Sequence, residues 1–110
     1  MEAIIIQCTV PSRDEARAIG RALLDAKLAA CVSIAGEVES HYWWQGAIEE
    51  ARELVVVIKT TRERFDAVRR TILEHHSYQV PEILALPVVD GHGPYLDWLA
   101  GCVRSGEAER

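Results

Sequence analysis

The sequence lacks the features that define several large classes of protein. No apolar run approaches the about 18 residues that a membrane-spanning helix needs, so we expect no transmembrane segment. Positive charge is scarce, because 12 lysines and arginines stand against 17 aspartates and glutamates and no basic stripe stands out. The resulting net charge of −5 argues against nucleic acids and anionic membranes as partners. The apolar start of the chain carries no positively charged leader, so no secretory signal is expected.

Paired cysteines and the common catalytic motifs are also missing. The three cysteines, Cys8, Cys31 and Cys102, are odd in number and lack the CxxC spacing. Reduced thiols in a cytoplasmic protein therefore fit better than a disulfide framework. The chain contains no GxGxxG, P-loop or GxSxG motif, and no nucleophile is recognisably paired with a base. We therefore predict no catalytic residues and expect that the protein is not an enzyme.

What the chain contains is typical of one globular domain. Hydrophobic residues make up 49% and charged residues 26% of its 110 residues, so we expect a single domain over residues 1–110. Apolar alternation predicts a first strand over Ala3–Val10, and the capping-box spacing of Ser12 and Glu15 begins a helix that runs to about Leu28. The later predicted elements are strands over 30–35, 37–45 and 47–59, a helix from a second capping box at 60–63 to about His76, a strand over 82–89 and a helix from Pro94.

This order predicts an α+β fold, a ferredoxin-like βαββαβ sandwich with an extended central hairpin and an added C-terminal helix. Pro87 cannot donate a backbone hydrogen bond, so the last strand is expected at a sheet edge. Two helices cover only one face of such a sheet, yet Ile4–Ile6 and Leu54–Ile58 are apolar on both faces. Another copy of the chain is the simplest cover for the second face, which predicts a homo-oligomer.

One group of residues suggests a metal site. The fold places the end of the first strand near the start of the last, which brings Cys8 close to His75, His76 and Glu82. A thiolate and imidazoles suit copper or zinc. The alternative is that Cys8 is a small core residue and that the two histidines only favour the helix terminus at which they lie.

The hairpin carries two further groups. Its acids could attract hard divalent ions, but a solvated, charged edge is the more typical interpretation; they are Glu37, Glu39, Glu49, Glu50 and Glu53. Its aromatic residues, Tyr42, Trp43 and Trp44, are more typical of a subunit contact than of a base-stacking site. His41 and His92 are interpreted as surface loop residues.

Six segments, taken in order, resemble the divalent-cation tolerance (CutA) family over about residues 3 to 103. They are Cys8–Pro11, Lys27–Val32, Tyr42–Glu50, Ile58–Thr61, His76–Ile83 and Tyr95–Leu99. The resemblance implies a compact homotrimer of ferredoxin-like subunits in which the long hairpin pairs with a neighbour. It also implies a link to divalent metals, copper (Cu²⁺) above all.

The resemblance assigns roles to individual residues. Cys8, His75 and His76 match the proposed metal ligands of the family, with Glu82 as an outer partner. A cleft between subunits is implied at Tyr42, Trp44, Glu50, Lys59, Tyr78, Glu82 and Trp98. Ser77 and Gln79 depart from the proline and glutamate that are frequent there, which implies a looser loop and a less acidic cleft.

These observations favour a non-enzymatic, cytoplasmic trimer that binds copper or a similar divalent cation and serves the response to metal ions. One alternative is a signalling trimer like the nitrogen-regulatory PII proteins, with a small molecule in each inter-subunit cleft; this rests on analogy of fold. A purely structural scaffold trimer is the other alternative.

Overall fold

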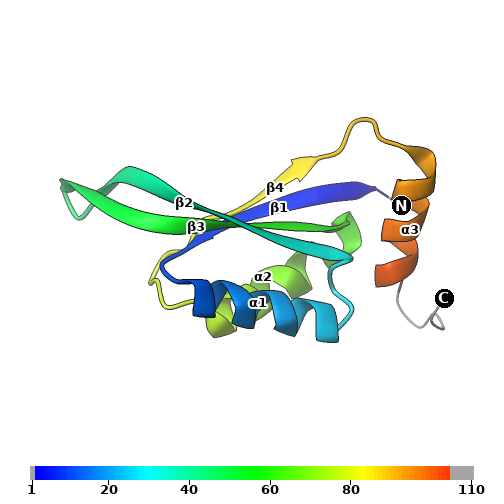
Figure 1. The fold of residues 1–110 in the computed structure, drawn as a ribbon, viewed down its shortest axis with the longest axis horizontal. Coiled ribbons are helices and arrows are strands. Elements are labelled where there is room, and N and C mark those ends of the chain that lie inside the picture. Colours follow the sequence, from blue (N-terminus) through cyan, green and yellow to red (C-terminus); the bar gives the residue numbers. More distant parts are fainter. Residues whose placement is uncertain (1, 105–110) are drawn as a thin grey trace.

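The computed structural model describes residues 2–104 and shows one four-stranded antiparallel sheet with two helices against it (Figure 1). The elements are β1 (Ala3–Val10), α1 (Arg13–Asp25), β2 (Cys31–Trp44), β3 (Ala47–Thr61), the 3₁₀ turn η1 (Arg62–Arg64), α2 (Phe65–His75), β4 (Ile83–Pro87) and α3 (Gly93–Val103). The strand order is β2-β3-β1-β4. This arrangement confirms the ferredoxin-like sandwich with its long hairpin and added terminal helix.

The core lies between the sheet and the helices α1 and α2. Alternate residues of β1, from Ile4 to Val10, are buried, and each is paired with a buried residue of β3. Helix α1 packs Ile19 and Leu23 against this face, and α2 packs Val68 and Ile72. The two apolar stripes are therefore what hold the helices on one side of the sheet.

The β2–β3 hairpin extends well beyond the helices (Figure 1) and accounts for the 47 Å length of the molecule. The separate extended stretches that the sequence predicts at 30–35 and 37–45 are one strand, because a β-bulge between Gly36 and Val38 shifts the register without ending it. Gly36 has φ +146°, and a Cβ atom there would lie 2.6 Å from Leu54 Cδ2. Glycine is therefore required where the strand bends.

Several helices and strands begin or end at other residues than the sequence predicts. Helix α1 ends at Asp25 rather than near Leu28, because Lys27 adopts a left-handed conformation with φ +57°. The second predicted capping box does not form: Thr61 makes no side-chain cap, and a 3₁₀ turn precedes α2. The last strand ends at Pro87 rather than Val89, and it does lie at the sheet edge as expected.

The second face of the sheet is open within the described chain. Both α1 and α2 lie on the same side, and α3 packs beside the end of the sheet that is remote from the hairpin tip (Figure 1). Ile5 is paired with Leu86 on the open face, and Leu84 follows there; the two leucines are 46% and 54% exposed. Across residues 2–104, no helix has the length and apolar character to span a membrane.

Candidate functional site

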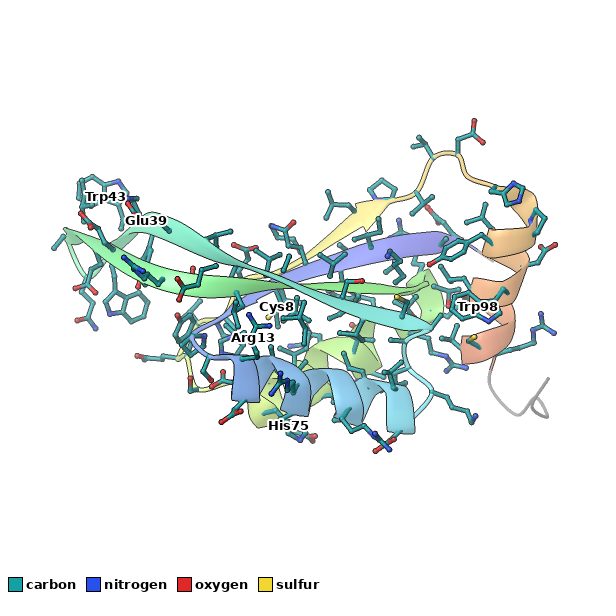
Figure 2. The ribbon with its side chains drawn as sticks, viewed as in Figure 1. Cys8, Arg13, Glu39, Trp43, His75 and Trp98 are labelled. Atoms are coloured by element: carbon teal, nitrogen blue, oxygen red, sulfur yellow. The ribbon has the colours of Figure 1, made fainter. Side chains whose placement is uncertain are left out.

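Cys8 lies in the core rather than at a surface. Its side chain is buried on the helix side of β1, and its Sγ atom lies 3.7 Å from the carbonyl oxygen of Thr9 (Figure 2). Burial, together with the nearby carboxylates, of which Glu82 has the largest effect, raises the pKa of the Cys8 thiol to about 12. A metal ligand must be a thiolate, so a metal ion that bound here would have to displace a strongly held proton.

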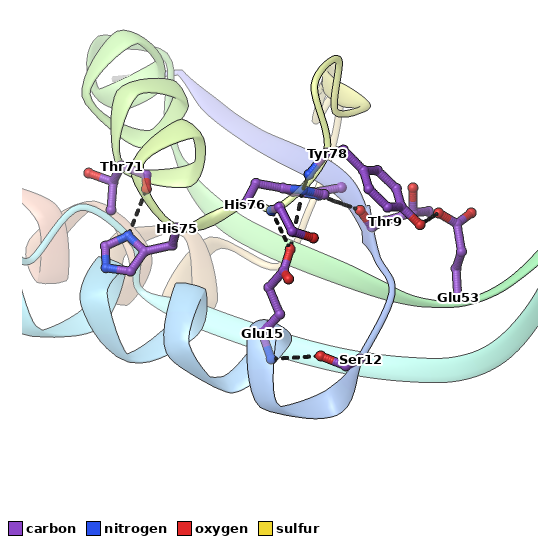
Figure 3. A network of polar contacts seen from close by, with 10 residues as sticks. Thr9, Ser12, Glu15, Glu53, Thr71, His75, His76 and Tyr78 are labelled. Atoms are coloured by element: carbon purple, nitrogen blue, oxygen red, sulfur yellow. Dashed lines mark hydrogen bonds and ion pairs between the residues drawn. The ribbon is translucent and has the colours of Figure 1, made fainter. Parts of the chain in front are cut away.

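His76 is enclosed, and its ring is fully engaged in the fold (Figure 3). Its Nε2 donates to the carbonyl oxygen of Thr9 at 2.7 Å, while Nδ1 accepts from the backbone N–H of Tyr78 at 3.1 Å. Glu15 lies beside the same ring, 3.2 Å from Nδ1, and accepts the N–H of Ser77. The Ser12 hydroxyl oxygen caps α1 by accepting a separate hydrogen bond from the backbone N–H of Glu15. His76 thus fastens the loop after α2 to the end of β1.

The predicted ligand set Cys8, His75, His76 and Glu82 is not brought together by this chain. His75 is exposed on α2, where its Nδ1 lies 2.9 Å from the carbonyl oxygen of Thr71 (Figure 3). Within residues 2–104, no three of these four residues place ligand atoms near enough to one another to hold one ion. Cys8 is buried in the core, His75 is exposed on α2, and His76 is bonded to the end of β1. The side chains therefore face different environments.

A different group, on the hairpin, does place its ligand atoms together. Glu39, His41 and Glu50 all lie within 4.8 Å of one another through their imidazole and carboxylate atoms. His41 Nε2 is 2.7 Å from Glu39 Oε2, and its Nδ1 is 3.6 Å from Glu50 Oε2. All three side chains are exposed, and Glu39 points to the same side of the hairpin as Trp43 (Figure 2).

Strand register explains this group. His41 is paired directly with Glu50 across the hairpin, and Glu39 lies two residues before His41 on the same face of β2. His41 lies within β2 and not in the surface loop that the sequence predicts. Hard divalent ions were the alternative to a solvated edge for the acids, but His41 was not predicted to join them. The period-2 spacing of Glu39 and His41 was the available signal, but the pairing with Glu50 depends on the length of the turn.

A groove of about 810 Å³ lies between the hairpin and the loop before β4. Tyr42, Trp44, Tyr78 and Glu82 of the predicted cleft line it. The other predicted cleft residues lie elsewhere in the same chain: Glu50 is beside His41, Lys59 is paired with Ile5 and Cys31 in the sheet, and Trp98 packs on Tyr95 with ring centroids 5.4 Å apart. The structure therefore assembles part of the predicted cleft.

Two hydrogen bonds organise the polar side of the groove. The Tyr78 hydroxyl donates to Glu53 Oε2 at 2.7 Å (Figure 3), and Gln7 Nε2 donates to Glu82 Oε2 at 3.0 Å. Burial and the neighbouring Glu53 carboxylate raise the pKa of Tyr78, so its hydroxyl keeps the proton that it donates. Glu53 is only 5% exposed. Nothing in the sequence indicates this burial beyond its place between the acidic part of the hairpin and an apolar run.

These features define a class: a ferredoxin-like α+β subunit with a protruding hairpin, an open apolar sheet face, and acidic and aromatic groups along the hairpin. Residues 4–102 match the family model described as CutA1 divalent ion tolerance protein. The chain is 44% identical over 99 residues to the divalent-cation tolerance protein CutA of Thermus thermophilus, across 90% of this chain and 95% of that protein.

Solved structures agree. CutA1 from Oryza sativa superimposes with a TM-score of 0.92 at 35% identity, covering 96% of this chain and 97% of that one. The structure described as the periplasmic divalent cation tolerance protein CutA from Archaeoglobus fulgidus gives a TM-score of 0.90 at 41% identity, covering 93% and 99%. The chain therefore belongs to the CutA1 divalent ion tolerance family, which confirms the resemblance found in the sequence.

Proposed function

We propose that this protein acts in divalent-cation tolerance by binding a divalent metal ion, copper (Cu²⁺) or an ion of similar chemistry, at Glu39, His41 and Glu50. The observation that carries the proposal is the approach of one imidazole and two carboxylates within 4.8 Å on one face of the hairpin. The membership of the chain in a divalent ion tolerance family supports a metal ion as the ligand.

The donor set favours a transition metal over magnesium or calcium. Imidazole suits copper, zinc and nickel, whereas hard ions prefer sites made of oxygen atoms alone. Copper stands highest among the divalent first-row ions in affinity for a given nitrogen and oxygen site. The Cys8 thiol is not part of this proposal, because it is buried in the core and does not belong to the group of ligand atoms on the hairpin.

The same proposal includes a homotrimer in the cytoplasm. The open apolar face around Ile5 and Leu86 supports a further copy of the chain as its cover, and the resemblance to the CutA family is the reason for three subunits. The absence of any disulfide among the three free cysteines fits a reducing compartment. In the trimer, each subunit would present its own hairpin cluster.

The test is a calorimetric titration of the reduced, metal-free protein with Cu²⁺ and, separately, with Mg²⁺. We expect saturable binding of Cu²⁺ at one ion per chain and a much weaker response to Mg²⁺. His41→Ala should weaken Cu²⁺ binding at least about tenfold, since it removes the nitrogen donor and leaves two exposed carboxylates.

His75→Ala is the matched control, because His75 is also an exposed histidine and lies outside the cluster. It should bind Cu²⁺ as the parent does. Equal binding by the His41 variant and the parent would contradict the site. Loss of binding in the His75 variant alone would return attention to the end of α2.

A further inference from the structure

His76 is a buried titratable residue that the proposed metal site does not use. Its side chain is 0% exposed within one chain, so its surroundings are complete without a second copy. The ring bonds the loop after α2 to the end of β1 and lies outside the group of ligand atoms on the hairpin (Figure 3). Because histidine is the side chain whose charge ordinarily changes between about pH 5 and 8, this bond is placed to respond to pH.

Three polar groups surround the two ring nitrogens of His76. Nε2 lies 2.7 Å from the carbonyl oxygen of Thr9, which can only accept, so this nitrogen carries a proton. Nδ1 lies 3.1 Å from the backbone nitrogen of Tyr78, which can only donate, and 3.2 Å from Glu15 Oε2. The neutral ring therefore bonds to Thr9 and Tyr78, and the Glu15 carboxylate faces a nitrogen without a proton.

A second proton on the ring changes the partner of Nδ1. The imidazolium donates from both nitrogens, so Nδ1 can no longer accept the N–H of Tyr78. The Glu15 carboxylate is then the acceptor at hand. Since the His76 and Glu15 side chains are 0% and 15% exposed, water screens the attraction between their opposite charges only weakly. Protonation thus exchanges a hydrogen bond within the loop for an ion pair with α1.

The other titratable groups near the ring leave Glu15 as its charged partner. The rings of Tyr78 and His76 lie 4.8 Å apart, and burial raises the pKa of the Tyr78 hydroxyl, which stays protonated. Burial also raises the pKa of the Cys8 thiol on β1 to about 12, so this group is neutral between pH 5 and 8. The remaining groups are bonded to other partners: Glu53 to Tyr78, Glu82 to Gln7, and His75 to Thr71.

We propose that His76 is a pH-sensitive switch that fixes Tyr78 when the ring is neutral and releases it when the ring is protonated. In the neutral state the ring holds the Tyr78 backbone, and the Tyr78 hydroxyl bonds to Glu53 on β3 at 2.7 Å. In the protonated state the Tyr78 N–H loses its acceptor, whereas the N–H of Ser77 keeps Glu15. The change is therefore centred on Tyr78, which lines the groove beside the hairpin.

The experiment is a nuclear magnetic resonance titration of the full-length, metal-free protein from pH 8 to pH 5. The scalar coupling between the amide nitrogen of Tyr78 and Nδ1 of His76 reports their hydrogen bond directly. We expect the coupling to disappear as the ring gains its proton, and the protection of the Tyr78 amide against hydrogen exchange to fall about three- to tenfold. A ring that stays neutral down to pH 5, or a coupling that persists after protonation, would overturn the proposal.

Glu15→Gln tests the ion pair, because the amide oxygen can still accept the N–H of Ser77 but carries no charge. The coupling should then disappear about one pH unit lower than in the parent. Glu74→Gln is the matched control, since it removes one negative charge from an exposed position on α2. It should behave as the parent does. Equal shifts in both variants would overturn the proposal, and the parent titration decides it without either variant.

Discussion

At the scale of single residues, burial decides which groups keep their ordinary chemistry. Cys8 and His76 are reactive side chains by type, yet the core encloses the first and the fold uses both ring nitrogens of the second. His41 is the reverse case, since its place on an exposed strand leaves it beside two carboxylates. Residue type therefore names the candidates for chemistry, and the environment selects among them.

The Cys8 thiol should make the stability of the protein fall at high pH. Its ordinary pKa of 9.0 applies to the unfolded chain, and burial raises the pKa to about 12 in the fold. The folded form thus holds its proton where the unfolded form loses it, so stability is retained below pH 9 and declines as the pH rises toward 12. From about pH 8 to about pH 10, the parent should lose about 1.4 kcal/mol more than Cys8→Val, measured by urea unfolding.

This comparison cancels every other group that titrates over the same range, because the two proteins differ only at one side chain. An identical pH dependence in the parent and in Cys8→Val would show that the thiol ionises as freely in the fold as in the unfolded chain. That result would contradict the burial seen here.

Tyr78→Phe should destabilise the fold through Glu53. The change removes the only side-chain hydrogen bond that Glu53 receives in the described chain and leaves a nearly buried carboxylate without a donor. We expect a loss of about 1 to 3 kcal/mol in the free energy of unfolding, measured with urea. Tyr95→Phe is the control, since none of the hydrogen bonds found among residues 2–104 involves that hydroxyl, and it should cost far less. Equal losses of unfolding free energy in the two variants would show that the hydrogen bond from Tyr78 to Glu53 does not stabilise the fold.

At the scale of elements, two adjacent threonines at the end of β3 differ in their hydrogen bonding. Thr60 is buried, and its hydroxyl donates to the carbonyl oxygen of Leu28 at 2.6 Å, which ties the segment after α1 to β3. Thr61 is equally buried, but its hydroxyl has no hydrogen-bond partner among residues 2–104. Because a buried hydroxyl is favourable only when it is hydrogen-bonded, the two threonines should respond differently to the same substitution.

Thr60→Val should cost about 1 to 2 kcal/mol in the free energy of unfolding, because the Leu28 carbonyl loses its donor. Thr61→Val should be neutral or should stabilise the protein, because it replaces an unpaired hydroxyl by a methyl group of similar size. Thermal and urea unfolding of the two variants, side by side, check both signs. Similar losses in both would mean that Thr61 has a partner in solution.

At the scale of the whole molecule, the open sheet face is the feature that one chain leaves unexplained. Leu84 and Leu86 stand on it in the edge strand β4, beside β1. A sheet face with this much apolar surface, together with a hairpin that protrudes from the body, fits a chain built to assemble with copies of itself.

Leu86→Lys should therefore weaken the proposed trimer, because it places a charge on the face that another copy would cover. Light scattering at several concentrations should show a shift from trimer toward monomer. Leu73→Lys is the control: Leu73 is 44% exposed, close to the 46% of Leu86, but it lies on α2 away from the open face. A trimer that withstands both changes would contradict assembly through this face.

The sequence by itself determined the fold class, the order of the elements and the edge position of the last strand, because each follows from local signals. Alternating apolar residues define β1, the serine at position 12 caps α1, and Pro87, which has no backbone N–H to donate, favours an edge position for the strand that it ends. The continuity of β2 through the bulge at Gly36 was not predicted, since a glycine is equally typical of the end of a strand and of a bend within one.

Only the tertiary structure decided which side chains meet. Cys8, His75 and His76 lie where the topology predicts, yet each points to a different environment, and that direction depends on the packing of α2 against β1. The hairpin cluster arises from cross-strand register, and the burial of Glu53 arises from a loop some 25 residues further along the chain. Local chemistry thus fixes the elements, while long-range contacts, which no short stretch of sequence encodes, fix the sites.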